Sequence, residues 1–259
     1  MNKIRIWKAI GRGVLLESVR RKDLWVIAIL GMIIILAASM LGFFGVRGLE
    51  VFVKDLAVTV LGIFSTIVAI LTSSRLLPDE IRNRTLYPLL ARPITRMDLL
   101  LGKFFGAVAA TWIGFLMLAA LTAVALLIFH VQFEWVMIQY MVLKMMGLVV
   151  LCAVTLTLSA YMTPQAAATM SFVLAFGSVM FEQGLLMAGN SAGKGMRPIF
   201  ATVSDILPQY HLFDEGSRAA NIGWGSAPIW VVLALGTYMI FYSGAMISMA
   251  WSKFRKQAI

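Results

Sequence analysis

Few residues of this 259-residue chain are of a kind that performs chemistry, and their positions limit what they can do. Hydrolysis within apolar helices needs a Ser or Cys nucleophile with a His or Lys base, or paired aspartates at helix depth. The only histidines, His130 and His211, lie at or beyond the ends of apolar runs, and no aspartate lies well inside one. We therefore expect no catalytic residues and no enzyme activity in this chain.

Phosphate and metal sites are also poorly supported. The stretch GNSAGKG at 189–195 resembles a P-loop superficially, but it has three residues between its glycines where four are needed, and Gly195 follows Lys194 in place of Ser or Thr. A flexible turn is the better interpretation. The single cysteine, Cys152, cannot form an intrachain disulfide or a cysteine metal cluster. No cofactor or metal is therefore predicted.

Methionines at four-residue spacing leave one alternative open. Met137, Met141 and Met145 could form a track of soft metal ligands or could be packing material in an apolar helix. The packing interpretation is favoured, because flexible thioether side chains fill gaps between apolar helices.

Two charged residues, Lys144 and Glu182, lie inside long apolar runs. A charge buried alone in a membrane is costly, so intramembrane ionisable residues usually pair or face a polar cavity. The sequence predicts that the two side chains pair or line one outward-facing polar cavity. The alternative is that each extends separately to the lipid headgroups.

Composition places the chain in the membrane. Hydrophobic residues make up 61% and charged residues only 13%, against about a quarter in soluble domains. The net charge of +10 comes from basic clusters beside apolar runs, with no aromatic-studded basic face, so nucleic acid is not an expected partner. The sequence predicts a polytopic protein in a lipid bilayer.

Dividing the chain at its charges predicts an all-α fold in which residues 24–259 form a six-span domain. A helix of about 20 apolar residues crosses a bilayer. Pro164 separates two spans because proline disfavours helix in the residue before it, and Pro228 suits a first helical turn. The predicted transmembrane helices are 24–46, 56–74, 104–129, 138–162, 166–187 and 228–250.

Basic residues predict the orientation. Sixteen Lys and Arg residues lie in the N-terminal segment, in 75–103 and in the tail, against five in the segments on the opposite side. By the positive-inside rule, both termini are expected in the cytoplasm and the protein in the inner cell membrane.

Residues 1–23 are predicted to form a cytoplasmic amphipathic helix in the membrane interface, with a solvated basic leader as the alternative. Gly11 and Gly13 weaken the prediction of a helix. The apolar residues at roughly helical spacing are Ile4, Trp7, Val14, Leu15 and Val19.

A charged stretch, EIRNRTLYPLLARPITRMDLLLGK at 80–103, interrupts the apolar runs. An apolar stripe at helical spacing, Leu86, Leu89, Leu90 and Pro93, predicts a surface held by a partner. The prolines predict a short helix over 79–87, then a turn and a new helix starting near Thr95. Thr95 and Asp98 are a plausible capping pair for that helix.

This stretch resembles the segment after the second span of type-2 ABC transporter permeases, most closely the branch associated with multicopper-enzyme maturation. Arg84 departs from the glycine found at that position in many members. The stretch ILPQYHLFDEG at 206–216 is similar, more weakly, to the outer-loop motif of this group. The resemblance rests on Glu80, Thr85, Leu89, Leu90, Pro93, Ile94, Thr95, Arg96, Leu99, Leu100, Gly102 and Lys103.

The resemblance implies a cytoplasmic coupling helix between spans two and three that docks into a separate ABC ATPase subunit. It also implies a dimer with a second permease copy or homologue. The alternatives are a mechanotransmitting or scaffold subunit with an outer-side partner at 188–227, or a secondary transporter. The implied ATPase-coupling residues are Asp79, Glu80, Arg82, Arg84, Thr85, Leu86, Leu89, Leu90, Arg92, Pro93 and Arg96.

Overall fold

In the computed structural model most of the described residues are helical, and no strand occurs among them. These residues are 3–20, 25, 29, 31–33, 49–78, 95–128, 134–191, 202, 207–216, 219, 225 and 227–256. The elements are α1 (Lys3–Arg20), α3 (Leu49–Arg75), α6 (Arg96–Ile128), α7 (Trp135–Tyr161), α8 (Pro164–Ser191), the 3₁₀ helix η2 (Tyr210–Phe213) and α11 (Ile229–Lys256).

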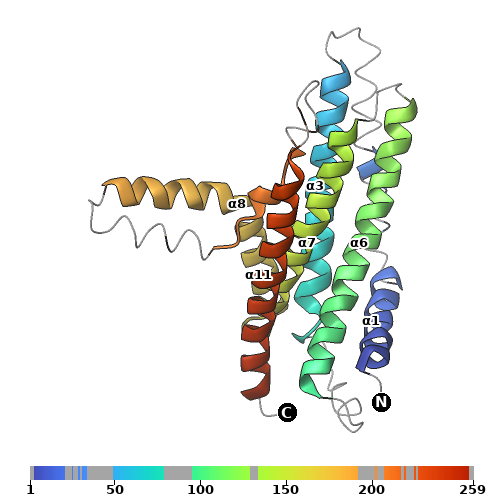
Figure 1. Ribbon diagram of the computed structural model, residues 1–259. Helices are drawn as coiled ribbons and strands as arrows, with labels where there is room; N and C mark the ends of the chain where they lie inside the picture. The colour runs from blue at the N-terminus through green and yellow to red at the C-terminus, as the bar shows by residue number, and fades with distance from the viewer. Residues whose placement is uncertain are drawn as a thin grey trace.

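Four helices in the described part are long and apolar enough to cross a membrane: residues 51–75, 96–127, 135–161 and 229–255. They run side by side as an upright bundle, and α1 lies along the lower half of α6 (Figure 1). The predicted span 24–46 lies mostly outside the described residues. The predicted span 166–187 lies within α8, which is not among the four, so the number of six spans stays a prediction.

The membrane helices begin earlier than the charges suggested. Helix α3 begins at Leu49, before the predicted span 56–74, and its Lys54 is neutralised by Glu134 at 2.7 Å. Helix α6 begins at Arg96, as the predicted helix start near Thr95 indicated, and therefore extends before the charge-free stretch 104–129. Here Lys103 is buried and donates a hydrogen bond to a backbone carbonyl. Lys54 and Lys103 thus lie inside helices where the fold gives each of them a partner.

Both proline predictions agree with the helix ends. Tyr161 ends α7, Met162 is extended, and Pro164 starts α8. Pro228 directly precedes α11, and its carbonyl accepts a hydrogen bond from the Val231 amide at 3.0 Å.

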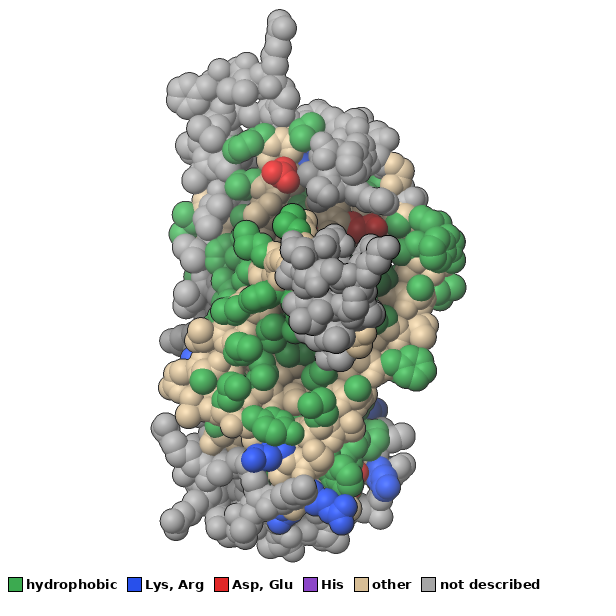
Figure 2. Space-filling model, turned by 90° about the vertical axis from the view of Figure 1, so that its left-hand side faces the viewer, with side chains coloured by type: hydrophobic (Ala, Val, Ile, Leu, Met, Phe, Trp, Pro, Cys, Tyr) green, Lys and Arg blue, Asp and Glu red, His purple; other side chains and the backbone are tan. Residues whose placement is uncertain are grey.

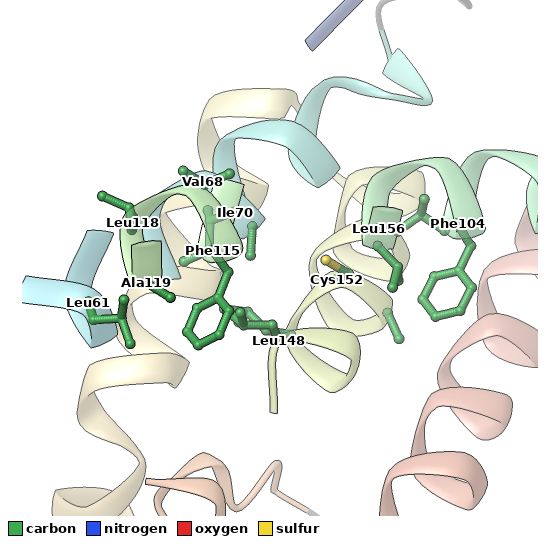
Figure 3. Close-up of a cluster of buried hydrophobic side chains, with 14 of the residues drawn as sticks. Leu61, Val68, Ile70, Phe104, Phe115, Leu118, Ala119, Leu148, Cys152 and Leu156 are labelled. Atoms are coloured by element: carbon green, nitrogen blue, oxygen red, sulfur yellow. The ribbon is translucent and has the colours of Figure 1, made fainter. Parts of the chain in front are cut away.

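The core lies where α3, α6 and α7 meet (Figure 3). Phe115 is fully buried in it, and Cys152 contacts Thr111 across the α6–α7 interface. Met137 is buried in this core and Met141 and Met145 pack against it, which supports the packing interpretation of the methionine series. The apolar side chains that meet there include Leu61, Val68, Ile70, Phe104, Phe115, Leu118, Leu148 and Leu156.

Glycines let α1 approach α6 closely. A Cβ at Gly106 would lie 2.9 Å from the Gly11 Cα, and one at Gly102 would lie 2.9 Å from the Ile10 Cβ. Ile6 and Val14 are buried. Gly11, which weakened the sequence prediction of a helix, therefore serves the contact between helices, where small residues allow backbones to meet.

The later part of α8 leaves the bundle sideways (Figure 1). Met180 and Met187 are 80% and 68% exposed there. The earlier part packs against α3 and α7. The helix is thus longer than predicted, and its later part does not run parallel to the other membrane helices.

Candidate functional site

Two regions gather polar side chains. We call the end of the bundle where α1 begins and α11 ends the basal end, and the opposite end the distal end (Figure 1). At the basal end, Thr95 and Asp98 form a reciprocal cap on α6. The Asp98 amide donates to Thr95 Oγ1 at 3.2 Å, and the Thr95 hydroxyl donates to Asp98 Oδ2. The predicted capping pair is confirmed.

Helix α1 is attached to this cap. Trp7 Nε1 donates to Asp98 Oδ1 at 3.0 Å, and the indole stacks on Phe105 at 5.9 Å between ring centroids. Asp98 is buried, so its carboxylate oxygens take part in contacts within the fold and not with bulk water. The N-terminal helix thereby holds the first turn of α6.

Two basic residues tie α6 to other helices at the basal end. Lys103 Nζ donates to the Leu76 carbonyl just beyond α3, and Arg96 donates to the carbonyls of Phe254 and Arg255 at 3.2 Å each. The Lys103 contact joins the chain on both sides of residues 79–94. A displacement of that segment would thus act on α3, α6 and α11 together.

Most predicted coupling residues, Asp79 to Pro93, lie outside the described residues. Arg96 is the described member of the set, and it donates two hydrogen bonds to carbonyls of α11. The structure therefore describes the contacts on both sides of the segment, which we call the basal frame: Lys103 with the Leu76 carbonyl, and Thr95 with Asp98. The docking surface itself stays a prediction.

Basic and acidic side chains are concentrated at opposite ends of the bundle. Figure 2 shows Lys and Arg side chains mostly toward the basal end and Asp and Glu side chains mostly toward the distal end. The exposed basic side chains on α1, at the end of α3 and at the end of α11 are Lys3, Arg5, Lys8, Arg12, Arg20, Arg75, Lys253 and Arg255.

The second region is a distal cavity of about 480 Å³ between α3, α7, α8 and residues 207–216. Its walls combine an apolar part with polar and aromatic side chains. The lining residues used below are Asp55, Thr59, Ile63, Thr66, Tyr140, Lys144, Leu148, Leu151, Phe176, Tyr210, His211, Phe213 and Asp214.

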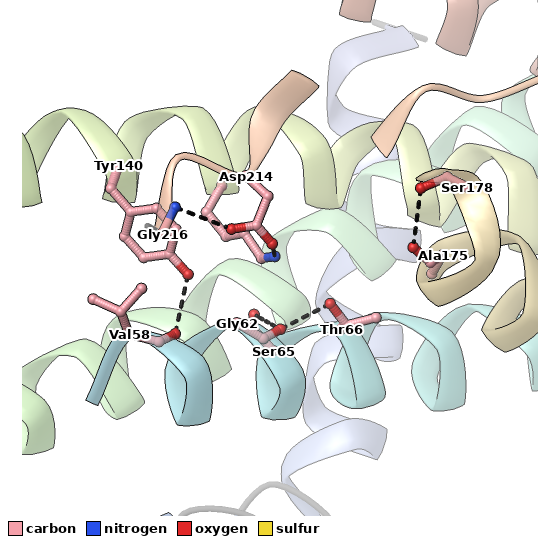
Figure 4. A network of polar contacts seen from close by, with 10 residues as sticks. Val58, Gly62, Ser65, Thr66, Tyr140, Ala175, Ser178, Asp214 and Gly216 are labelled. Carbon is pink, nitrogen blue, oxygen red and sulfur yellow. Dashed lines mark hydrogen bonds and ion pairs between the residues drawn. The ribbon is translucent and has the colours of Figure 1, made fainter. Parts of the chain in front are cut away.

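Lys144 lines this cavity and pairs with an acid that the sequence analysis missed. Its Nζ lies 2.7 Å from Asp214 Oδ2, and the side chains are 12% and 47% exposed. Asp214 Oδ1 also accepts from the Gly216 amide at 3.2 Å (Figure 4). Glu182 lies in α8, but its side chain is outside the described part, so the predicted Lys144–Glu182 pairing stays a prediction. Asp214 is part of the 206–216 motif, although no periodicity connects it to Lys144.

Segment 207–216 is packed tightly over α7 and α3. Phe213 is buried against Gly147, where a Cβ would lie 2.8 Å from the Phe213 Cβ. A Cβ at Gly216 would likewise lie 2.9 Å from Val58 Cγ1 of α3. These close approaches explain why glycines occupy both positions, and they place Asp214 beside Lys144.

Two tyrosines, Tyr140 and Tyr210, form part of the wall of the distal cavity. Tyr140 donates from its hydroxyl to the Val58 carbonyl at 3.2 Å, which links α7 to α3 (Figure 4). Burial raises the pKa of Tyr210 well above its usual value, so its phenol stays protonated, and its hydroxyl has no hydrogen-bond partner among the described residues. Sequence reasoning found neither tyrosine, because both act through contacts distant in sequence.

Comparison with known proteins agrees with this architecture. A family model described as ABC-2 family transporter protein matches residues 18–182, more than half of the chain, and a search of curated proteins gives no match. The matched range includes α3, α6, α7 and most of α8, together with segment 79–94. The chain therefore belongs to the ABC-2 transporter family, as a multi-pass permease subunit of the kind that works with an ABC ATPase.

Proposed function

We propose that this chain exports its substrate with energy from a separate ABC ATPase subunit, which docks on residues 79–94. The observation that carries the proposal is the basal frame: Lys103 and the Thr95–Asp98 cap hold the two ends of this segment against α3 and α6. A partner that moves the segment would move both helices. The chain itself does not hydrolyse ATP in this proposal.

The residue types of the segment suit docking. Its leucine stripe can be buried in a groove of the ATPase, while Glu80, Arg82 and Arg84 make contacts at the rim that fix register. Arg96 then carries the displacement to the end of α11 through two backbone carbonyls. We place the chain in the branch associated with multicopper-enzyme maturation on the strength of the same segment.

The proposed topology has six spans with the basal end in the cytoplasm of an inner-membrane protein. The exposed basic residues at that end support this orientation, since Lys and Arg are enriched on the cytoplasmic side. Helix α1 then lies in the cytoplasmic interface, with its basic side toward headgroups and its apolar side on α6. One chain supplies half of the pathway, so the working unit is a permease dimer with two ATPase subunits.

Copurification tests the coupling assignment. The full chain is coexpressed with a P-loop ABC ATPase subunit, and the ATPase retained on the tagged permease is measured. Glu80→Lys and Leu89→Asp are each expected to reduce retention at least tenfold, because one reverses a rim charge and the other places a charge in the buried stripe.

Glu17→Lys is the matched control for the charge reversal. Glu17 is exposed on α1 and the change in net charge is the same, so retention should equal that of the unchanged chain. Full retention of the ATPase by both segment variants would disprove docking through 79–94. Equal loss in the Glu17 variant would show a non-specific charge effect and would disprove it as well.

A further inference from the structure

The distal cavity has the size and lining of a ligand site. Its volume of about 480 Å³ falls within the roughly 300–1,000 Å³ that small-molecule pockets occupy. Asp55, Thr59, Ile63 and Thr66 follow one another at helical spacing and line it from one face of α3. Asp55, Thr59 and Ile63 are exposed, so the cavity is accessible along this face.

The lining carries an excess of negative charge. Lys144 is neutralised by Asp214, which leaves Asp55 as the further carboxylate of the lining. Asp55 makes no ion pair with any described residue and is exposed. Its neighbour Lys54 is buried and paired with Glu134 outside the cavity.

Aromatic and apolar side chains form the rest of the wall. Tyr140, Phe176 and Tyr210 come from three different elements, and Leu148 and Leu151 add an aliphatic surface. Aromatic faces attract cations through their quadrupole, and apolar surface holds a hydrocarbon body. Tyr210 also offers a hydroxyl with no partner among the described residues.

From these observations we propose that the distal cavity binds amphipathic organic cations, with the positive group beside Asp55 and the apolar body against α7 and α8. Its role as the substrate site of export rests on the proposed function, whereas binding itself does not. In this arrangement Lys144 competes with the ligand for Asp214, because its ammonium pairs with the carboxylate that would otherwise attract the cation.

A pair of probes with nearly the same shape and opposite charge tests the proposal. Tetraphenylphosphonium is a permanent cation, and tetraphenylborate is its anionic counterpart. Equilibrium dialysis measures saturable binding of each to the full chain in nanodiscs of zwitterionic lipid, with binding to empty nanodiscs subtracted. The phosphonium is expected to bind saturably and the borate at least tenfold more weakly.

Variants that change the charge of the cavity should change the affinity for the phosphonium in opposite directions. Asp55→Asn should weaken phosphonium binding about fivefold, which corresponds to the interaction of one partly solvated charge. Lys144→Met should strengthen it by a similar factor, because Asp214 loses its internal partner. Glu17→Gln, an exposed acid of α1 far from the cavity, should leave the affinity unchanged.

A cavity-filling pair keeps the test decisive if a charge variant folds poorly. Thr59→Phe narrows the cavity at an exposed α3 position, and Thr237→Phe adds the same bulk on the exposed side of α11. Only the first should reduce binding. Equal binding of both probes, no change with Asp55→Asn, or weaker binding with Lys144→Met would each overturn the proposal. Because no ATPase is present, such a result would leave the docking of segment 79–94 untouched.

Discussion

Two lysines of the described membrane helices form ion pairs with acids that lie far away in the sequence. Lys54 Nζ lies 2.7 Å from Glu134 Oε1 across 80 residues, and Lys144 meets Asp214 across 70. In both pairs the lysine lies on a membrane helix and the acid lies outside one. The lysine is the more buried member each time, with 3% and 12% of its side chain exposed.

This asymmetry predicts unequal effects at the Lys54–Glu134 pair. Glu134→Gln leaves an ammonium that is 3% exposed without its counter-charge, whereas Lys54→Met leaves a carboxylate that is 32% exposed and can be hydrated. We expect Glu134→Gln to cost about 3–5 kcal/mol of unfolding free energy and Lys54→Met clearly less. Denaturant unfolding in detergent, followed by tryptophan fluorescence, measures both.

The double variant Lys54→Met/Glu134→Gln serves as the control. It removes both charges and should be more stable than Glu134→Gln alone, because no buried ammonium remains. If the two single variants lose equal stability, the exposure argument is wrong.

The sequence predicted side-chain contacts correctly where the two residues are close together in the chain. Thr95 and Asp98 are three residues apart, and local capping rules identified them. Asp214 was missed as the partner of Lys144 because only the fold places segment 207–216 over α7. The proposed partner Glu182 was closer in sequence, but closeness along two apolar runs does not determine which acid approaches a lysine.

Among the elements, α1 shows how a residue that disfavours helix can stabilise a helix pair. Gly11 and Gly106 lie so close that a Cβ on Gly106 would come within 2.9 Å of the Gly11 Cα and 2.8 Å of the Val14 Cβ. A Cβ added at Gly13, two residues along, would meet nothing within 4 Å. Sequence reasoning treated both α1 glycines alike, since their difference arises only when α6 is in place.

Alanine substitutions should separate these roles. Gly106→Ala is expected to lower stability by about 1–3 kcal/mol, because added volume at a close contact forces the two helices apart. Gly13→Ala is expected to leave stability unchanged or to raise it by up to about 1 kcal/mol, since alanine favours helix over glycine. Thermal unfolding of the purified chain gives the order of the two variants.

Hydrogen exchange locates the effect. Gly106→Ala should speed exchange of the α1 amides, while exchange in the α7 core should stay as it was. Unchanged protection of α1 would mean that the glycine contact does not hold this helix.

Across the whole molecule, hydropathy predicted the membrane helices well because the physical requirement is simple. A helix that crosses lipid must be long and apolar, and four of the predicted spans coincide with helices that meet this condition. Their ends were less predictable, because Lys54 and Lys103 lie inside the helices and find partners there. The sideways course of later α8 and the distal cavity had no periodic signal, since both depend on how helices pack.

Orientation is the property of the whole chain that site-specific labelling can test. In a Cys152→Ala background, which removes the free buried thiol, single cysteines replace Lys3 and Ser252 at the basal end and Trp135 and Ile229 at the distal end. A membrane-impermeant maleimide is applied to spheroplasts before and after permeabilisation. The distal cysteines should react in intact spheroplasts, and the basal ones only after permeabilisation, because the basic end faces the cytoplasm. Reaction of the basal pair in intact spheroplasts would invert the topology and remove segment 79–94 from reach of a cytoplasmic ATPase. Labelling of all four sites only after permeabilisation would contradict the outward placement of the distal cavity.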